Sequence, residues 1–192
     1  MGLPVCWSMD IVGPISRTVE DCAITLQAIA GYDPKDSYSY NGTIPDYRNN
    51  LTADIRGVRV GLVMNKIYDH GVDPEISHSV MEAGKSLEKL GAKVEELHLP
   101  LLDKAGAISK IITDLEGASL HYERVKSGDL GYDHNSRIRI ISGAVTPAYV
   151  YYKAQKLRQL VRNEVLDALR KVDILAMPTS PTVAPKIATR AG

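Results

Sequence analysis

Residues 57–99 read GVRVGLVMNKIYDHGVDPEISHSVMEAGKSLEKLGAKVEELHL, and this stretch decides the fold class. Alternating apolar residues predict one strand near residues 57–64 and a second over 93–99. Between them, Asp73 followed by Pro74 is typical of a helix start, and the apolar stripe that follows ends at Gly91. A strand, a helix and a strand over this length indicate a βαβ unit with parallel strands.

The flanking residues extend this unit. Apolar periodicity predicts helices over 101–125, 136–142 and 147–171 and a third strand over 173–177. Gly106 and Gly117 interrupt the pattern of the first helix, which allows close packing or a kink. Residues 126–135 are polar and contain glycine, which favours a loop. We therefore predict an α/β fold with a small, mostly parallel or mixed sheet and helices packed against it. We treat residues 1–192 as a single domain in which residues 32–54 form an irregular connection.

The composition is that of an ordinary globular protein, with 44% hydrophobic and 24% charged residues. A net charge of zero argues against a generally basic surface for nucleic acid. No apolar run reaches the roughly 20 residues that a membrane span needs. Cys6 and Cys22 form no disulfide framework, and we place both in apolar surroundings as reduced thiols. These features favour a cytoplasmic protein without membrane contact.

The segment WSMDIVGPISRTVEDCA at residues 7–23 predicts an extended arm, a turn and a capped helix. Gly13 and Pro14 disfavour helical geometry at the turn. Thr18 followed by Asp21 three residues later is typical of a capping box, and the helix that it opens should end at Gly31.

This segment resembles the one that follows the catalytic signature in amidase signature enzymes, which hydrolyse or transfer amides. The similarity continues in GVRVG at residues 57–61, LGAKV at 90–94, YKAQKLR at 152–158 and DILAMPTSP at 173–181. In that family, to which one of the subunits of glutamyl-tRNA(Gln) amidotransferase belongs, one serine is the nucleophile and a second serine, in a cis peptide, passes protons to a lysine. The resemblance implies that all three residues lie upstream of residue 7.

The family's glycine- and serine-rich signature does not occur in these residues, so the resemblance assigns no catalytic residue to this chain. We expect an internal to C-terminal portion of an amidase that is inactive alone, needs no cofactor, and belongs to an enzyme acting on small-molecule amides. Further copies of the chain or amidotransferase subunits are the expected partners. The alternative is a non-catalytic binding module on the same scaffold, which a native start at Met1 would favour.

Two substrate-binding residues follow from the resemblance. In the glutamine-using members, an arginine before the long helix is thought to bind the substrate carboxylate, and Arg139 is the best match in the segment SRIRI at residues 136–140. A guanidinium group suits a planar carboxylate. Tyr132 is the candidate for a pocket wall. The alternative for Arg139 is a structural salt bridge.

Other sites are less favoured. Ser86 and Lys89 match a Ser-x-x-Lys pattern, but they lie on the polar face of a predicted helix. The basic side of the helix over 147–171 is interleaved with acidic residues, which favours a solvated face over an RNA site. We expect no metal site, because the five histidines lack metal-ligand spacing and fit surface or capping roles: His70, His78, His98, His121 and His134.

Overall fold

The computed structural model describes residues 4–52, 54–128 and 131–186. Its contacts divide the chain into two units, one formed by residues 11–54 and the other by residues 1–10 and 55–192. The interpretation of residues 1–192 as a single domain stays a prediction. Among the described residues, no helix combines the length and the apolar character needed to cross a membrane.

The smaller unit contains one helix, α1 (Val19–Ile29), followed by irregular chain. The Thr18 hydroxyl accepts a hydrogen bond from the Asp21 amide at 3.0 Å, which confirms the predicted cap. The helix ends at Ile29, slightly before the predicted Gly31. Described residues between 32 and 54 form neither helix nor strand, and an ion pair from Arg48 to Glu20 ties this connection to α1.

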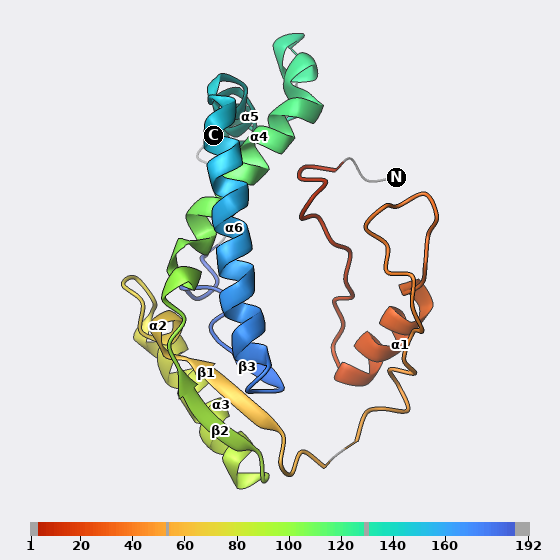
Figure 1. Ribbon diagram of the computed structural model, residues 1–192, viewed down its shortest axis with the longest axis vertical. Coiled ribbons are helices and arrows are strands. Elements are labelled where there is room, and N and C mark those ends of the chain that lie inside the picture. The colour runs from red at the N-terminus through yellow and green to blue at the C-terminus, as the bar shows by residue number, and fades with distance from the viewer. Residues whose placement is uncertain (1–3, 53, 129–130, 187–192) are drawn as a thin grey trace. The chain divides into compact units, whose positions relative to one another are not determined.

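The larger unit contains a three-stranded parallel sheet (Figure 1). The strands β1 (Arg59–Val63), β2 (Lys93–Leu97) and β3 (Ile174–Ala176) lie in the order β2-β1-β3. Helix α2 (Met64–Ile67) follows β1, and α3 (Pro74–Lys89) begins after Asp73, whose carboxylate accepts a hydrogen bond from the Glu75 amide. The α/β fold and the helix start at Asp73 are therefore confirmed.

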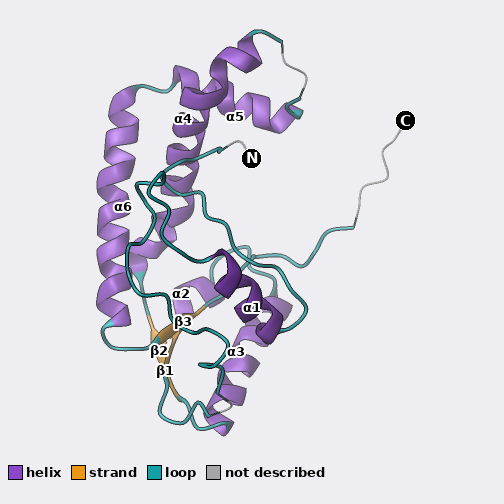
Figure 2. Cartoon of the chain, turned by 90° about the vertical axis from the view of Figure 1, so that its right-hand side faces the viewer, coloured by secondary structure: helices purple, strands orange, loops and turns teal. Residues whose placement is uncertain are grey.

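Three longer helices complete this unit. After the 3₁₀ turn η1 (Pro100–Lys104) come α4 (Ala105–Lys126), α5 (His134–Val145) and α6 (Ala148–Leu169). Helices α4 and α6 lie side by side, and α5 packs on the end of α4 away from the sheet (Figure 2).

Two helix predictions are settled in detail by the structure. Helix α4 continues through Gly106 and Gly117, and at Gly117 the missing side chain lets the Val5 backbone approach, which is the close packing predicted as one of two roles for these glycines. Helix α5 begins at His134, inside the predicted loop, because the Asp133 carboxylate accepts hydrogen bonds from the Asn135 and Ser136 amides.

The core lies on both faces of β1 and between α4 and α6. Val63 packs with Leu99 and with Ala168 of α6 on one face of the sheet, while Leu62 lies against Gly84 of α3 on the other. Between α4 and α6, a second cluster contains Cys6, Ile108, Ile112 and Ala154. The segment that includes Cys6 is thereby packed onto the helices; we call residues 4–10 the N-terminal arm.

Candidate functional site

A cavity of about 220 Å³ lies between α4, α5 and the N-terminal arm. The two helices approach closely because Gly143 of α5 has no side chain: a Cβ there would overlap the Asp114 carbonyl group. The lining residues are Val5, Thr113, Asp114, Gly117, His121, Tyr132, Ser136, Arg139 and Ile140.

The guanidinium group of Arg139 lines this cavity and is held in place through its Nε atom. The Arg139 Nε donates to Asp114 Oδ1 at 2.6 Å, and Asp114 Oδ2 accepts from Lys110 Nζ. The Asp114 side chain is 9% exposed, whereas that of Arg139 is 47% exposed. Within the described part of the chain, the Nη atoms of Arg139 have no acceptor. Asp114 therefore orients the guanidinium group and leaves its outer edge able to donate two parallel hydrogen bonds to a ligand.

Tyr132 is fixed by a buried histidine. The Tyr132 hydroxyl lies 2.8 Å from His121 Nδ1, and His121 Nε2 lies 2.6 Å from the Pro4 carbonyl oxygen. Because a carbonyl oxygen only accepts, His121 Nε2 donates to the Pro4 carbonyl, and the Tyr132 hydroxyl, which can donate or accept, pairs with Nδ1. Arg124 lies over the Tyr132 ring, 5.6 Å from its centroid. The ring is thereby positioned as a wall of the cavity.

A second polar centre joins the N-terminal arm to α4 and α6. The buried Glu116 carboxylate accepts hydrogen bonds from the Ser8 amide at 3.1 Å, the Ser8 hydroxyl at 2.6 Å and the Tyr151 hydroxyl at 2.9 Å, and the Cys6 thiol lies 3.2 Å away. Arg158 donates to the Ser8 carbonyl at 2.9 Å. Burial raises the pKa of Glu116, but these hydrogen bonds outweigh burial and lower it below its ordinary value.

This centre corrects the interpretation of Cys6, whose surroundings are not wholly apolar. Burial, followed by the hydrogen bond and charge of Glu116, raises the pKa of the Cys6 thiol. A raised pKa is the opposite of what a nucleophilic cysteine needs. The Ser86 hydroxyl donates to the Glu82 carbonyl on the exposed face of α3, so the Ser-x-x-Lys pattern forms no serine–lysine pair there. Among the described residues, no three His, Cys, Asp or Glu side chains are grouped to hold a metal ion.

The family model described as Amidase matches residues 2–192. The chain belongs to the amidase family. A glutamyl-tRNA(Gln) amidotransferase subunit from Gloeobacter violaceus is 37% identical over 201 residues, which are 92% of this chain and 41% of that protein. The same subunit from Pseudomonas savastanoi pv. phaseolicola is 35% identical over 207 residues, which are 95% of this chain and 43% of that protein. This amidase chain thus spans about two fifths of the length of these relatives.

Solved structures agree with this assignment. One matching structure comes from a vestigial protein complex described as revealing the evolutionary origins of an s-triazine catabolic enzyme. It matches with a TM-score of 0.88 at 30% sequence identity, and the match covers 97% of this chain and 40% of that protein. The corresponding glutamyl-tRNA(Gln) amidotransferase subunit from Thermotoga maritima matches with a TM-score of 0.71 at 32% identity, over 91% of this chain and 38% of its own. The resemblance to amidase signature enzymes is therefore confirmed.

The structure of this amidase chain brings the two sequence-predicted site residues together. Arg139 and Tyr132 line the same cavity, and Arg139 also forms the salt bridge that was its alternative role. Their substrate-binding role stays a prediction. Sequence reasoning missed Asp114 and gave His121 a surface or capping role, which was wrong, because His121 is buried. These two residues hold Arg139 and Tyr132 in place. The available signal was their helical spacing with Gly117, which places all three residues on one face of α4.

Proposed function

We propose that this chain supplies the carboxylate-binding wall of an enzyme that hydrolyses or transfers amides. The observation that carries the proposal is the arrangement of Arg139, which lines the cavity and whose Nε is held by Asp114. A guanidinium group held in this way recognises a planar carboxylate through two parallel hydrogen bonds. Tyr132 limits the cavity on another side. A small amide that also carries a carboxylate, such as glutamine, fits this chemistry.

The bond-breaking groups are proposed to come from outside this chain. Within the described residues, no lysine Nζ lies within hydrogen-bonding distance of a serine hydroxyl, and an unactivated serine is a weak nucleophile. We therefore expect the 192-residue chain to bind the carboxylate without hydrolysing simple amides. The similarity to one of the amidotransferase subunits and to a protein from a complex supports assembly with partner subunits.

The test measures glutamine binding to the 192-residue chain by isothermal titration calorimetry. Arg139→Gln should weaken binding by about tenfold to a hundredfold, because charge-assisted hydrogen bonds to the carboxylate are lost. Arg137→Gln is the matched control, since Arg137 lies on the same helix but does not line the cavity. Propionamide, which has no carboxylate, should bind no better to the wild type than to Arg139→Gln.

Two results would contradict the proposal. Equal glutamine affinity in the Arg139→Gln and Arg137→Gln variants would show that Arg139 does not bind the carboxylate. Release of ammonia from glutamine or propionamide by the purified chain, well above the rate in buffer, would show that the reactive groups are present in these residues.

A further inference from the structure

The irregular chain after α1 is held by hydrogen bonds at two places. On one side, the Ser39 hydroxyl accepts a hydrogen bond from the Asp33 amide at 2.8 Å. On the other side, the Tyr47 amide donates to the Gln27 side chain of α1 at 2.9 Å. Among the described residues, residues 40–45 between these two places form no hydrogen bond. This stretch can therefore change its backbone angles without breaking any contact that holds α1.

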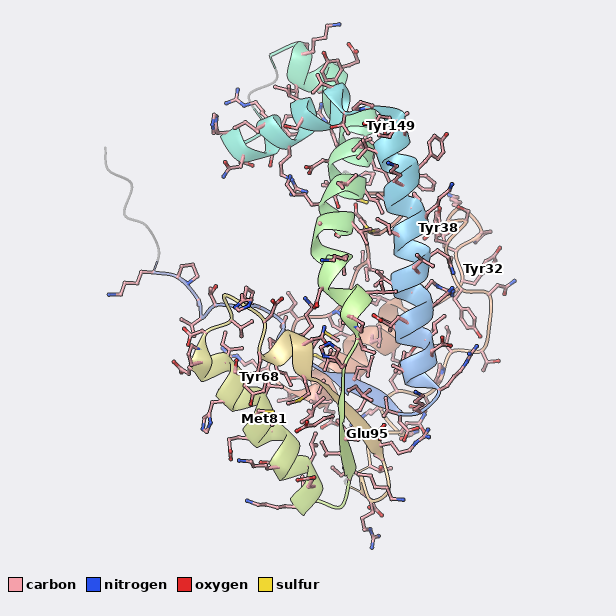
Figure 3. The ribbon with its side chains drawn as sticks, turned by 60° about the vertical axis from the view of Figure 1, so that its left-hand side comes forward. Tyr32, Tyr38, Tyr68, Met81, Glu95 and Tyr149 are labelled. Carbon is pink, nitrogen blue, oxygen red and sulfur yellow. The ribbon has the colours of Figure 1, made fainter. Side chains whose placement is uncertain are left out.

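The same stretch is open to solvent. Tyr40 is 73% exposed, and Asn41 and Gly42 are exposed as well. The side chain of the neighbouring Tyr38, which is labelled in Figure 3, is also exposed. Neither a helix nor a strand includes these residues. Water and dissolved base therefore have access to the peptide bond between Asn41 and Gly42.

An asparagine followed by glycine can react with its own backbone. The amide nitrogen of the glycine attacks the side-chain Cγ of the asparagine, and the new N–Cγ bond closes a succinimide ring. The Cγ–Nδ2 bond breaks, and ammonia leaves with the proton of the attacking amide. Water then opens the ring at one of its two carbonyl groups and gives aspartate or isoaspartate. Glycine favours this reaction because it has no side chain to hinder the attack and its backbone angles are the least restricted.

Two other asparagines of the same connection are restrained at the attacking atom. The Asn50 amide, which would attack Asn49, donates to the Asp46 carbonyl at 3.1 Å. The Leu51 amide, which would attack Asn50, donates to the Arg48 carbonyl at 3.2 Å. Each of these hydrogen bonds must break before a succinimide can form.

The asparagines of the larger unit are restrained as well. The Ser136 amide, which follows Asn135, donates to the Asp133 carboxylate at 3.1 Å. The amide that follows Asn163 lies inside α6, where amides donate to the carbonyl four residues earlier. The Asn65 side chain is itself fixed, because its Nδ2 donates to the Leu99 carbonyl at 2.9 Å and its Oδ1 accepts from the Leu99 amide at 2.9 Å.

We propose that Asn41 is a modification site, at which attack by the Gly42 amide deamidates the folded chain while the other asparagines stay intact. Within the described residues, neither the Asn41 carboxamide nor the Gly42 amide has a hydrogen-bond partner. One ordinary hydrogen bond at the attacking amide slows the reaction about tenfold, and Gly42 lacks this restraint. The product adds a negative charge to a chain whose net charge is zero. This proposal does not depend on carboxylate binding.

The experiment stores the purified 192-residue chain in warm, mildly alkaline buffer and follows it by tryptic peptide mapping with mass spectrometry. Trypsin releases residues 36–48, which contain Asn41 as their single asparagine, and residues 49–56, which contain Asn49 and Asn50. The 36–48 peptide should show the mass change of an amide becoming an acid, in separate aspartate and isoaspartate forms. Its rate should exceed that of the 49–56 peptide by about tenfold or more.

Unfolding in urea separates the role of the structure from that of the local sequence. Urea breaks the hydrogen bonds of the Asn50 and Leu51 amides, so the 49–56 peptide should react about tenfold faster than in the folded chain. The rate at Asn41 should change by less than about twofold, because no hydrogen bond restrains it in the fold.

Two variants check the chemistry. Gly42→Ala should slow the reaction about tenfold, because the added methyl group hinders the attack. In the fold this methyl group would meet only the end of the exposed Tyr40 side chain, which can move aside. Asn41→Gln, whose longer side chain does not close the five-membered ring, should leave the 36–48 peptide unchanged.

Three results would overturn the proposal. The first is an Asn41 that stays intact in the folded chain although a synthetic 36–48 peptide reacts under the same conditions. The second is an equal rate for the 36–48 and 49–56 peptides in the folded chain. The third is a tenfold acceleration at Asn41 in urea, which would show that the fold protects this residue after all.

Discussion

Replacing Glu116 by glutamine tests whether its carboxylate holds the N-terminal arm onto the helices. The carboxylate faces four donors, two at each oxygen: the Ser8 hydroxyl and Tyr151 at Oε1, and the Ser8 amide and the Cys6 thiol at Oε2. Glutamine keeps one acceptor oxygen and places an NH₂ donor against the other pair. Two donors, buried or part-buried, then lose their acceptor, at about 1–3 kcal/mol each. Because glutamine avoids burying a charge, we expect a net loss of about 2–4 kcal/mol.

The measurement is urea unfolding of wild type and variant, followed by circular dichroism. Glu123→Gln is the control, because Glu123 lies on the same helix, is exposed, and has only a distant ion pair with Lys126 at 3.9 Å. Its free energy of unfolding should change by no more than about 0.5 kcal/mol. A Glu116→Gln variant as stable as Glu123→Gln would refute the reasoning.

The contribution of Glu116 to the free energy of unfolding should also depend on pH, in a direction that follows from its pKa. The pKa of Glu116 is lower in the folded chain than its ordinary value of 4.5. The carboxylate therefore stabilises the fold above pH 4.5, and this contribution is lost as the pH falls below 4.5 through the lower folded pKa. The difference in stability between wild type and Glu116→Gln should shrink over that interval. Parallel stability curves through that interval would contradict the assigned role.

Three further outcomes are expected. Gly143→Ala should lower the melting temperature by several degrees, because its Cβ would overlap the Asp114 carbonyl, whereas Gly106→Ala, with open space at that position, should be neutral or stabilising by about 0.5–1 kcal/mol. Cys6, which is 2% exposed, should react with a thiol reagent in urea but only slowly in the native chain. The Asp173 carboxyl, whose pKa Arg59 lowers to about 2, should titrate near that pH by NMR, and Arg59→Gln should raise the value toward 3.8.

Local signals in the sequence predicted most of the secondary structure. The caps at Thr18 and Asp73 depend on contacts between residues three or fewer positions apart, and the strands follow from alternation within a few residues. The start of α5 was missed although its signal was also local: Asp133 is a good N-cap, but the polar stretch around it favoured a loop. Local chemistry therefore placed the elements, with errors of a few residues at their ends.

The contacts around the candidate site, in contrast, join residues that are far apart in the sequence. Cys6 and Glu116 are 110 positions apart, and Pro4 and His121 are 117 apart. Periodicity on a helix indicates which residues share a face, but it does not say which distant segment will pack there. For this reason Arg139 could be proposed from a resemblance, while its orienting partner Asp114 could not.

Helix α4 connects the two polar centres. Asp114, Gly117 and His121 face the cavity, while Glu116 faces α6 and the N-terminal arm. The arm contacts both centres, because Val5 lines the cavity and Ser8 is bound to Glu116.

Loosening the arm at Glu116 should therefore also disturb the cavity. Val5 would lose its fixed position against Gly117, and His121 would lose its acceptor at the Pro4 carbonyl and with it the support for Tyr132. Glu116→Gln should thus weaken glutamine binding together with stability, whereas Arg139→Gln, which leaves Asp114 paired with Lys110, should weaken binding with a smaller loss of stability. This difference separates a residue that contacts the ligand from one that holds the wall of its site.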